Sequence, residues 1–144
     1  MSNAWANHVN FCPGQISVDS KSNEIPAVQE LLTILNLKGT TVTANAMHCQ
    51  KQTAKIIIDR EADYVIPVKD NQPKFLAVIM HQFDKWGENS LSDKRVRSQT
   101  KKVKNQGRQK PRTCMAGPAP AALKNKFAAL QTISLLRREQ VLAD

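Results

Sequence analysis

His48 and Cys49 are neighbours in the run Thr43-Ala44-Asn45-Ala46-Met47-His48-Cys49-Gln50, between an expected strand and an expected helix. Open α/β sheets bind their ligands at such strand-to-helix turns. An imidazole beside a thiol is the combination that activates a cysteine nucleophile. Adjacent residues at a helix start point about 100° apart, however, and no third group that would orient the pair is evident. A helix cap and a buried thiol explain these residues more simply.

A second strand-to-helix turn, Lys69-Asp70-Asn71-Gln72-Pro73, offers a carboxylate and two amides. We expect Asp70 or Asn71 to cap the helix that Pro73 opens. A carboxylate metal site needs two or three convergent acids. The acids near expected strand ends are Asp19, Asp63 and Asp70, and none has an evident companion. Nor are Cys12, Cys49 and Cys114 spaced for a disulfide framework or a zinc site, so we expect reduced, structural thiols.

Basic residues are concentrated in the last third of the chain. Residues 1–93 hold 8 Lys/Arg against 10 Asp/Glu, a net charge of −2, whereas residues 94–144 hold 13 against 2, a net charge of +11. The run from Lys94 to Arg112 has nine cations, no acid and two valines. With so few apolar residues, it is expected to form a cationic arm or loop that does not order unaided.

This basic arm is the clearest functional feature of the sequence. A run of cations without acids favours binding to nucleic-acid phosphates, and the lack of interleaved aromatic residues favours a DNA duplex over single strands. The alternative is a solvated loop whose charge only aids solubility. The expected DNA-binding residues are Lys94, Arg95, Arg97, Lys101, Lys102, Lys104, Arg108 and Arg112.

The elements that must position these residues alternate between strands and helices. A hairpin is expected from Trp5 to Asn10 and from Gln15 to Asp19, with its turn at Pro13-Gly14. A helix then follows the cap candidates Ser22 and Asn23, and the β-branched residues 40–44 predict a strand. A second helix (49–61), a strand (64–68) and a third helix from Pro73 complete this part.

This order predicts an α/β fold with parallel strands joined to an antiparallel hairpin. The third helix should bury one face: Phe75, Leu76, Ile79, Phe83 and Trp86. Beyond the break at Gly117-Pro118, the Ala/Leu-rich stretches 121–130 and 133–143 read as helical. We therefore expect a core over residues 1–93, a basic arm over 94–118 and a helical C-terminal segment over 119–144.

Several short motifs in order resemble one family of bacterial proteins. They are Trp5-Ala6, Gly14-Gln15, Val18-Asp19, Lys21-Ser22-Asn23-Glu24-Ile25, Leu31-Leu32, Leu35, Leu37-Lys38-Gly39, Ala46-Met47-His48-Cys49-Gln50-Lys51, Ala62-Asp63-Tyr64 and Lys69-Asp70-Asn71-Gln72-Pro73. From Trp5 to Trp86 the chain resembles insertion-sequence transposases of the H-repeat-associated branch, within the DDE transposases. The resemblance implies an RNase H-like fold, a mixed sheet flanked by helices. In that fold two Asp and one Glu hold two Mg²⁺ or Mn²⁺ ions for phosphodiester transfer.

The family pattern implies that all three metal-binding positions are altered here. The first Asp would lie upstream of the region that matches Trp5, the second falls on Asn45, and the third, a Glu, falls on Lys110. An amide carries no charge to balance a divalent ion, and a cation would repel it. The resemblance therefore implies an incomplete, degenerate copy that has lost catalysis, and we expect no cofactor.

Three interpretations remain open. The chain is a segment of a DDE transposase whose activity needs parts from elsewhere, a non-catalytic DNA-binding remnant that interferes with an intact relative, or a basic RNA-associated protein. The last lacks the exposed aromatics that RNA binding would favour. Because no secretory signal or membrane span is evident, a cytoplasmic location is expected. An open strand edge near Trp5 predicts self-association or binding to an intact transposase.

Overall fold

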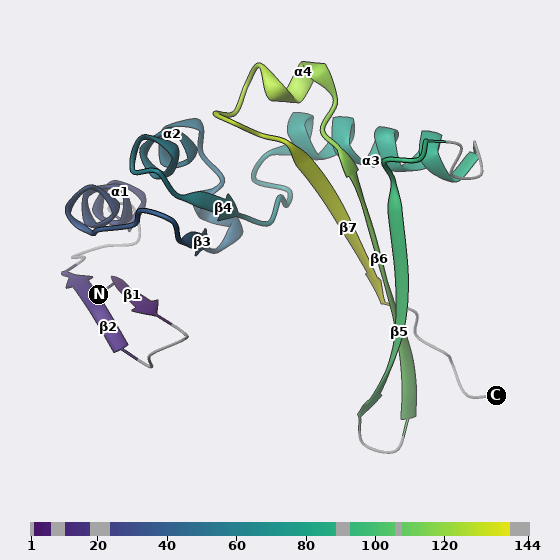
Figure 1. Cartoon of the computed structure of the whole chain (residues 1–144), viewed down its shortest axis with the longest axis horizontal. Helices are drawn as coiled ribbons and strands as arrows, with labels where there is room; N and C mark the ends of the chain where they lie inside the picture. Colours follow the sequence, from purple (N-terminus) through teal and green to yellow (C-terminus); the bar gives the residue numbers. More distant parts are fainter. Residues whose placement is uncertain (1, 7–10, 18–23, 89–92, 106–107, 139–144) are drawn as a thin grey trace. The chain divides into compact units, whose positions relative to one another are not determined.

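The computed structural model describes residues 2–6, 11–17, 24–88, 93–105 and 108–138 (Figure 1). Its contacts divide the chain into two compact units. Unit 1 comprises residues 1–73 together with 126–129, and unit 2 comprises residues 74–125 together with 130–144. The chain is mixed α/β, which confirms the predicted class. Its strands form three separate small sheets where a single mixed sheet was expected.

Unit 1 begins with an antiparallel hairpin of β1 (Ser2–Ala6) and β2 (Phe11–Ile16). The hairpin was predicted, but its turn was misplaced, because Pro13 and Gly14 lie inside β2 and Gly14 pairs with Ala4. Gly14 is required by packing: a Cβ there would lie 2.9 Å from Leu31 Cδ1. The missing side chain thus lets β2 approach α1 (Glu24–Ile34) closely. The cap candidates Ser22 and Asn23, like the predicted strand end at Asp19, lie outside the described residues.

The predicted β-α-β arrangement follows. β3 (Thr41–Thr43) and β4 (Asp63–Val65) pair in parallel, with Val42 opposite Tyr64. Between them lie the 3₁₀ helix η2 (Ala46–His48) and α2 (Lys51–Asp59). Apolar side chains between the helices and the two strands form the core: buried Leu32, Ile57 and Ala62, with Val28, Leu37, Val42, Ile56, Tyr64 and Ile66 around them.

Two hydrogen bonds join distant parts of unit 1. Gly39 adopts a φ of +72°, which glycine tolerates without strain, and its N–H donates to the carbonyl of Glu61 at 2.8 Å. The Tyr64 hydroxyl donates to the carbonyl of Ala128 at 2.8 Å. That bond attaches the returning segment 126–129 to β4, so a residue far along the chain completes the unit.

Unit 2 is organised around α3 (Pro73–Glu88), which begins at Pro73 and buries Phe75, Ile79, Phe83 and Trp86 as its 3.6-residue period predicts. The rings of Phe83 and Trp86 meet edge to face, with centroids 5.0 Å apart. A Cβ on Gly117 would lie 2.5 Å from Trp86 Cη2. Glycine at this position therefore allows the indole to lie directly on the backbone of the sheet.

That sheet is the main departure from the sequence predictions. Residues 94–112 were expected as an unordered arm, yet they contribute β5 (Arg97–Asn105) and the beginning of β6 (Arg108–Pro118), as far as Arg112. β6 pairs with β5 on one side and with β7 (Thr132–Arg138) on the other, both antiparallel. The run cannot bury enough apolar surface by itself, but β7 and α3, which lie outside it, supply that surface.

The C-terminal segment was also assigned wrongly. Of its described residues, only α4 (Ala121–Lys124) is helical, whereas residues 132–138 form β7. Ile133 is buried and Leu135 half-buried, while Thr132 and Ser134 are exposed. This period of two is typical of a strand with one covered face. Within the described ranges, no helix has both the length and the hydropathy that crossing a bilayer requires.

Candidate functional site

Asn45, which the resemblance predicts at the second metal-binding position, is separated from β3 by one residue and lies directly before η2. Its backbone is extended (φ −68°, ψ 159°), and its carbonyl accepts a hydrogen bond from the His48 N–H at 2.9 Å. Its side chain is exposed and makes no capping bond. The side-chain amide is therefore available at the carboxyl end of a parallel strand, the edge where α/β sheets bind ligands.

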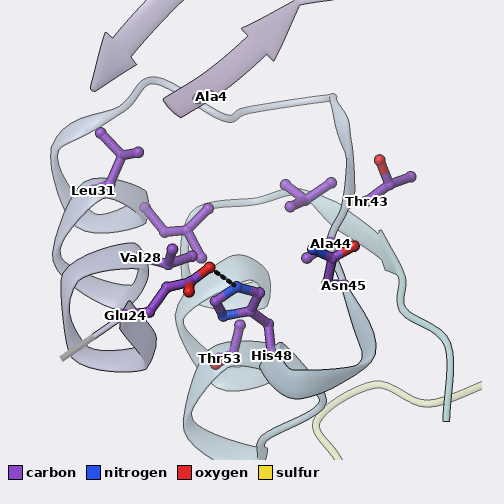
Figure 2. A pocket seen from close by; sticks show the side chains of 11 residues that line it. Ala4, Glu24, Val28, Leu31, Thr43, Ala44, Asn45, His48 and Thr53 are labelled. Atoms are coloured by element: carbon purple, nitrogen blue, oxygen red, sulfur yellow. Dashed lines mark ion pairs between the residues drawn. The ribbon is translucent and has the colours of Figure 1, made fainter. Parts of the chain in front are cut away.

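Asn45 lines a cavity of about 520 Å³ within unit 1 (Figure 2). The wall consists of one residue of β1, four of α1, residues 42–45, and two residues that follow them: Ala4, Glu24, Val28, Leu31, Leu32, Val42, Thr43, Ala44, Asn45, His48 and Thr53. The α1 side is apolar apart from Glu24, whereas the side after β3 carries an amide, an imidazole and hydroxyls. The cavity thus joins an apolar wall to a small polar corner.

The polar corner is built around His48, which is only 5% exposed. Its Nε2 lies 3.6 Å from Glu24 Oε1, a distance for an ion pair when the imidazole is protonated (Figure 2). Its Nδ1 is buried and has no hydrogen-bond partner among the described residues. A buried polar atom without a partner costs about 1–3 kcal/mol. Sequence reasoning missed the pairing with Glu24, because the two residues are far apart in the sequence and only packing brings them together.

Cys49 does not fit a nucleophile. It is buried, and burial raises the pKa of its thiol, whereas an activated cysteine needs a lowered one.

The carbonyl of Cys49 accepts a hydrogen bond from Gln72 Nε2 at 3.0 Å, and the carbonyl of Ala46 accepts one from Asn71 Nδ2 at 2.8 Å. The two strand-to-helix turns that the sequence singled out are therefore bonded to each other, and the amides at 71 and 72 hold them together.

The acids near strand ends do not assemble into a metal site. Asp63 and Asp70 are both exposed, and Asp19 lies outside the described residues. Nowhere in the described parts of the chain do three His, Cys, Asp or Glu side chains come together as a metal site would require. In unit 1 the side chain of Asn45 thus has a neighbouring imidazole and carboxylate, His48 and Glu24, but no cluster of acids.

The second candidate region is one face of the sheet in unit 2. Side chains alternate between the two faces of a strand, so Arg97 and Lys101 of β5 share a face. Lys101 pairs with Arg112 of β6, which places Arg112 on that face too. The opposite face carries Gly117, which contacts Trp86 of α3. We call the face with Arg97, Lys101 and Arg112 the cationic face.

Two of the predicted DNA-binding residues precede the sheet. Lys94 is exposed. Arg95 binds Asp93 through its backbone N–H, Nε and Nη2 at 3.0, 2.9 and 2.8 Å. These bonds lower the pKa of Asp93 to about 2, so the carboxylate is ionised and offsets much of the charge of Arg95. Among the cations of the predicted arm whose side chains the structure describes, Arg95 is therefore the least available to an anion.

The other predicted residues are placed by strand register. Lys102 pairs with Pro111, Lys104 with Gln109 and Arg108 with Asn105. Lys110, which the resemblance predicts at the Glu position, pairs with Val103 near the turn of the β5–β6 hairpin. Lys110 belongs to unit 2 and Asn45 to unit 1, so the two predicted metal positions lie in different units.

The chain has relatives among bacterial transposases. Over 84 residues, 58% of this chain, it is 43% identical to "Putative transposase YncI" of Escherichia coli O157:H7 and to the protein of the same name from strain K12. Over 70 residues, 49% of this chain, it is 43% identical to "H repeat-associated putative transposase YbfD" of strain K12. The matches cover 20%, 32% and 28% of these proteins, so the chain spans less than a third of each. No protein-family model and no solved structure matches the chain.

Proposed function

We infer from this kinship with H-repeat-associated transposases, which extends over about half of the chain, that the protein is a transposase segment that binds duplex DNA through the cationic face. Unit 1 then corresponds to part of an RNase H-like core. DNA binding without catalysis is the activity we propose. Because bacterial DNA lies in the cytoplasm, we propose the same location for this protein.

The pairing of Lys101 with Arg112 is the observation that carries the DNA-binding proposal. Like charges directly opposite each other on neighbouring strands destabilise a sheet by a few tenths to about 1 kcal/mol. The register also pairs Arg112 with Arg138 of β7, which sets three cationic positions in one row across the sheet. A phosphate backbone supplies the anions that relieve this repulsion, and counterion release then adds to the affinity.

The metals of the family do not fit the residues present. Asn45 offers one uncharged oxygen where a divalent ion needs a carboxylate, and Lys110 carries a positive charge. The nearest ionisable groups to Asn45 in the cavity wall are Glu24 and His48, which are already paired with each other. We therefore propose that the chain has lost the metal-dependent step of its family.

Binding is tested with a labelled duplex and the double variant Lys101→Gln, Arg112→Gln. Each removed phosphate contact should weaken binding about equally for any duplex sequence. The matched control is Lys38→Gln, Lys55→Gln, which removes two exposed lysines already paired with Glu61 and Asp59 in unit 1. We expect a loss of tenfold or more for the first pair and little change for the control. Equal losses would reject the cationic face, and preference for RNA over duplex DNA would favour the RNA-associated alternative.

Lost catalysis is tested by nicking of supercoiled DNA with Mg²⁺ or Mn²⁺. The unmodified chain should leave the plasmid intact, since its metal-binding positions are substituted. The variant Asn45→Asp, Lys110→Glu shows whether restoring the two acids suffices for cleavage. Metal-dependent nicking by the unmodified chain would overturn the proposal that catalysis is lost.

A further inference from the structure

The three-stranded sheet of unit 2 ends in two different edges. The strand order is β5-β6-β7, so within the described residues β5 and β7 each pair on one side only, with β6 (Figure 1). An edge strand presents unpaired N–H and C=O groups that can pair with another chain. Proteins commonly block such edges with charged side chains, lysine above all.

The two edges are blocked in this way to different extents. All of the side chains described on β5, from Arg97 to Lys101, are polar or charged and exposed. On β7, by contrast, Leu136 is 56% exposed and its neighbour Leu135 is half-buried. Leu136 pairs with Cys114, which pairs in turn with Gln99 of β5. One row across the sheet thus runs from a polar residue at the β5 edge to an exposed leucine at the β7 edge.

We propose that two copies of this chain associate through β7, antiparallel and about a two-fold axis that passes between the two Leu135 residues. Leu135 is the middle residue of the strand Thr132–Arg138, so this register pairs the whole strand with its copy. Leu136 of each copy then lies opposite Ser134 of the other, and the backbone groups of both edges are satisfied. A two-fold interface of this kind closes on itself and leaves no further edge of the same type.

Charge complementarity favours this register over the alternative edge. Through β7, Arg137 lies opposite Ile133 and Arg138 opposite Thr132, so no cation faces a cation. The equivalent pairing through β5, centred on its middle residue, places Lys101 opposite its own copy. Like charges directly opposite oppose pairing. The sequence of β7 therefore admits a second copy, and that of β5 repels one.

The pairing produces a six-stranded sheet with a perpendicular two-fold axis. In an antiparallel sheet of this symmetry, the same face of both copies points to the same side. Arg97, Lys101 and Arg112 of both copies would then form one continuous cationic surface. This consequence for DNA rests on the proposed function, whereas the association itself does not, and the experiments below use no DNA.

The first experiment measures the molar mass of the whole chain by light scattering and by sedimentation. We expect the unmodified protein at twice the mass of one chain, and the variant Leu136→Lys at the mass of one chain. Gln99→Lys is the matched control, because it adds the same charge in the same row at the opposite edge. It should remain dimeric. A monomeric unmodified protein, or equal effects of the two variants, would overturn the proposal.

The second experiment detects the register. Cysteine at the two-fold axis meets its own copy, so Leu135→Cys should form an interchain disulfide under mild oxidation, located by mass spectrometry of the 135–135 peptide. Paired residues on adjacent strands have Cβ atoms about 4.5–5.5 Å apart, close enough for a bond after a small shift. Thr132→Cys places its thiol opposite position 138 and should not cross-link with itself. Equal cross-linking of both variants would reject this register.

Discussion

The two units treat charge in opposite ways. In unit 1, two exposed lysines have acidic partners: Lys38 pairs with Glu61 and Lys55 with Asp59, both at 2.8 Å. In unit 2, Lys101 and Arg112 are paired with each other across two strands. Surface ion pairs contribute at most about 1 kcal/mol, so this difference affects folding little. It matters for binding, because the strand register of unit 2 sets Lys101 opposite another cation and not opposite an acid.

The units also differ in how they are held together. Unit 1 has a compact core of Leu32, Ile57 and Ala62 between helices and a short parallel sheet. Unit 2 has the amphipathic helix α3 on one face of a sheet, and Trp86 of this helix lies against Gly117 of β6. Asn45 and His48 thus lie in the unit with this core, and the face that we propose to bind DNA lies on the sheet of unit 2.

Ile57→Ala should have the largest effect on stability. Ile57 is 0% exposed, and truncating a buried isoleucine costs about 2–5 kcal/mol through lost burial and the cavity that remains. Urea unfolding measures this loss. Val65→Ala is the control, because Val65 is 61% exposed and should change the free energy of unfolding by less than about 0.5 kcal/mol. At temperatures where Ile57→Ala stays folded, its affinity for duplex DNA should equal that of the unmodified chain. A loss of affinity under these conditions would contradict the assignment of DNA binding to unit 2 alone.

Gly117→Ala should destabilise unit 2 by a smaller amount. The added Cβ would lie 2.5 Å from Trp86 Cη2, and overpacking of this kind costs about 1–3 kcal/mol. The fluorescence of Trp86 during urea unfolding reports on the change. Gly87→Ala provides the contrast, because nothing lies within 4 Å of a Cβ there and alanine favours a helix by about 0.5–1 kcal/mol. Equal stability of the two variants would contradict the close packing of α3 on the sheet.

Asp93→Asn should give the smallest effect, and it depends on pH. Arg95 lowers the pKa of Asp93 from 3.8 to about 2 in the folded chain, so the unfolded chain binds more protons between these values. The stability that the pair contributes is present above pH 3.8 and is lost as the pH falls through about 2. As the pH decreases through this window, the midpoint of unfolding should therefore decrease less steeply in Asp93→Asn than in the unmodified chain. Arg95→Gln should flatten the profile similarly, and a steeper profile in either variant would contradict the pairing.

Local patterns predicted most of unit 1 and the helix of unit 2. Phe75, Ile79, Phe83 and Trp86 repeat at helical spacing, and the β-branched residues before Asn45 indicate a strand, because each signal lies within the element itself. The prediction of transposase kinship rested on short motifs in order and is confirmed over about half of the chain. The RNase H-like fold, the metal positions and the DNA-binding residues remain predictions.

The sheet of unit 2 could not be predicted in the same way. The residues of β5 lack apolar alternation, and β6 finds its third strand only at Thr132, after a loop and α4. Pairing between such distant segments leaves no local signal, so composition alone suggested an unordered arm. The pairing of His48 with Glu24 was missed for the same reason. The turn predicted at Pro13-Gly14 was wrong, because glycine at position 14 allows close packing against Leu31 and does not form a turn.

The salt dependence of duplex binding tests the central claim most directly. The logarithm of the association constant, plotted against the logarithm of the salt concentration, should give a steep negative slope for the unmodified chain. In the triple variant Arg97→Gln, Lys101→Gln, Arg112→Gln that slope should shrink by about 1 for each cation removed. An unchanged slope in the triple variant, with duplex binding retained, would show that the cationic face is not where this protein contacts DNA.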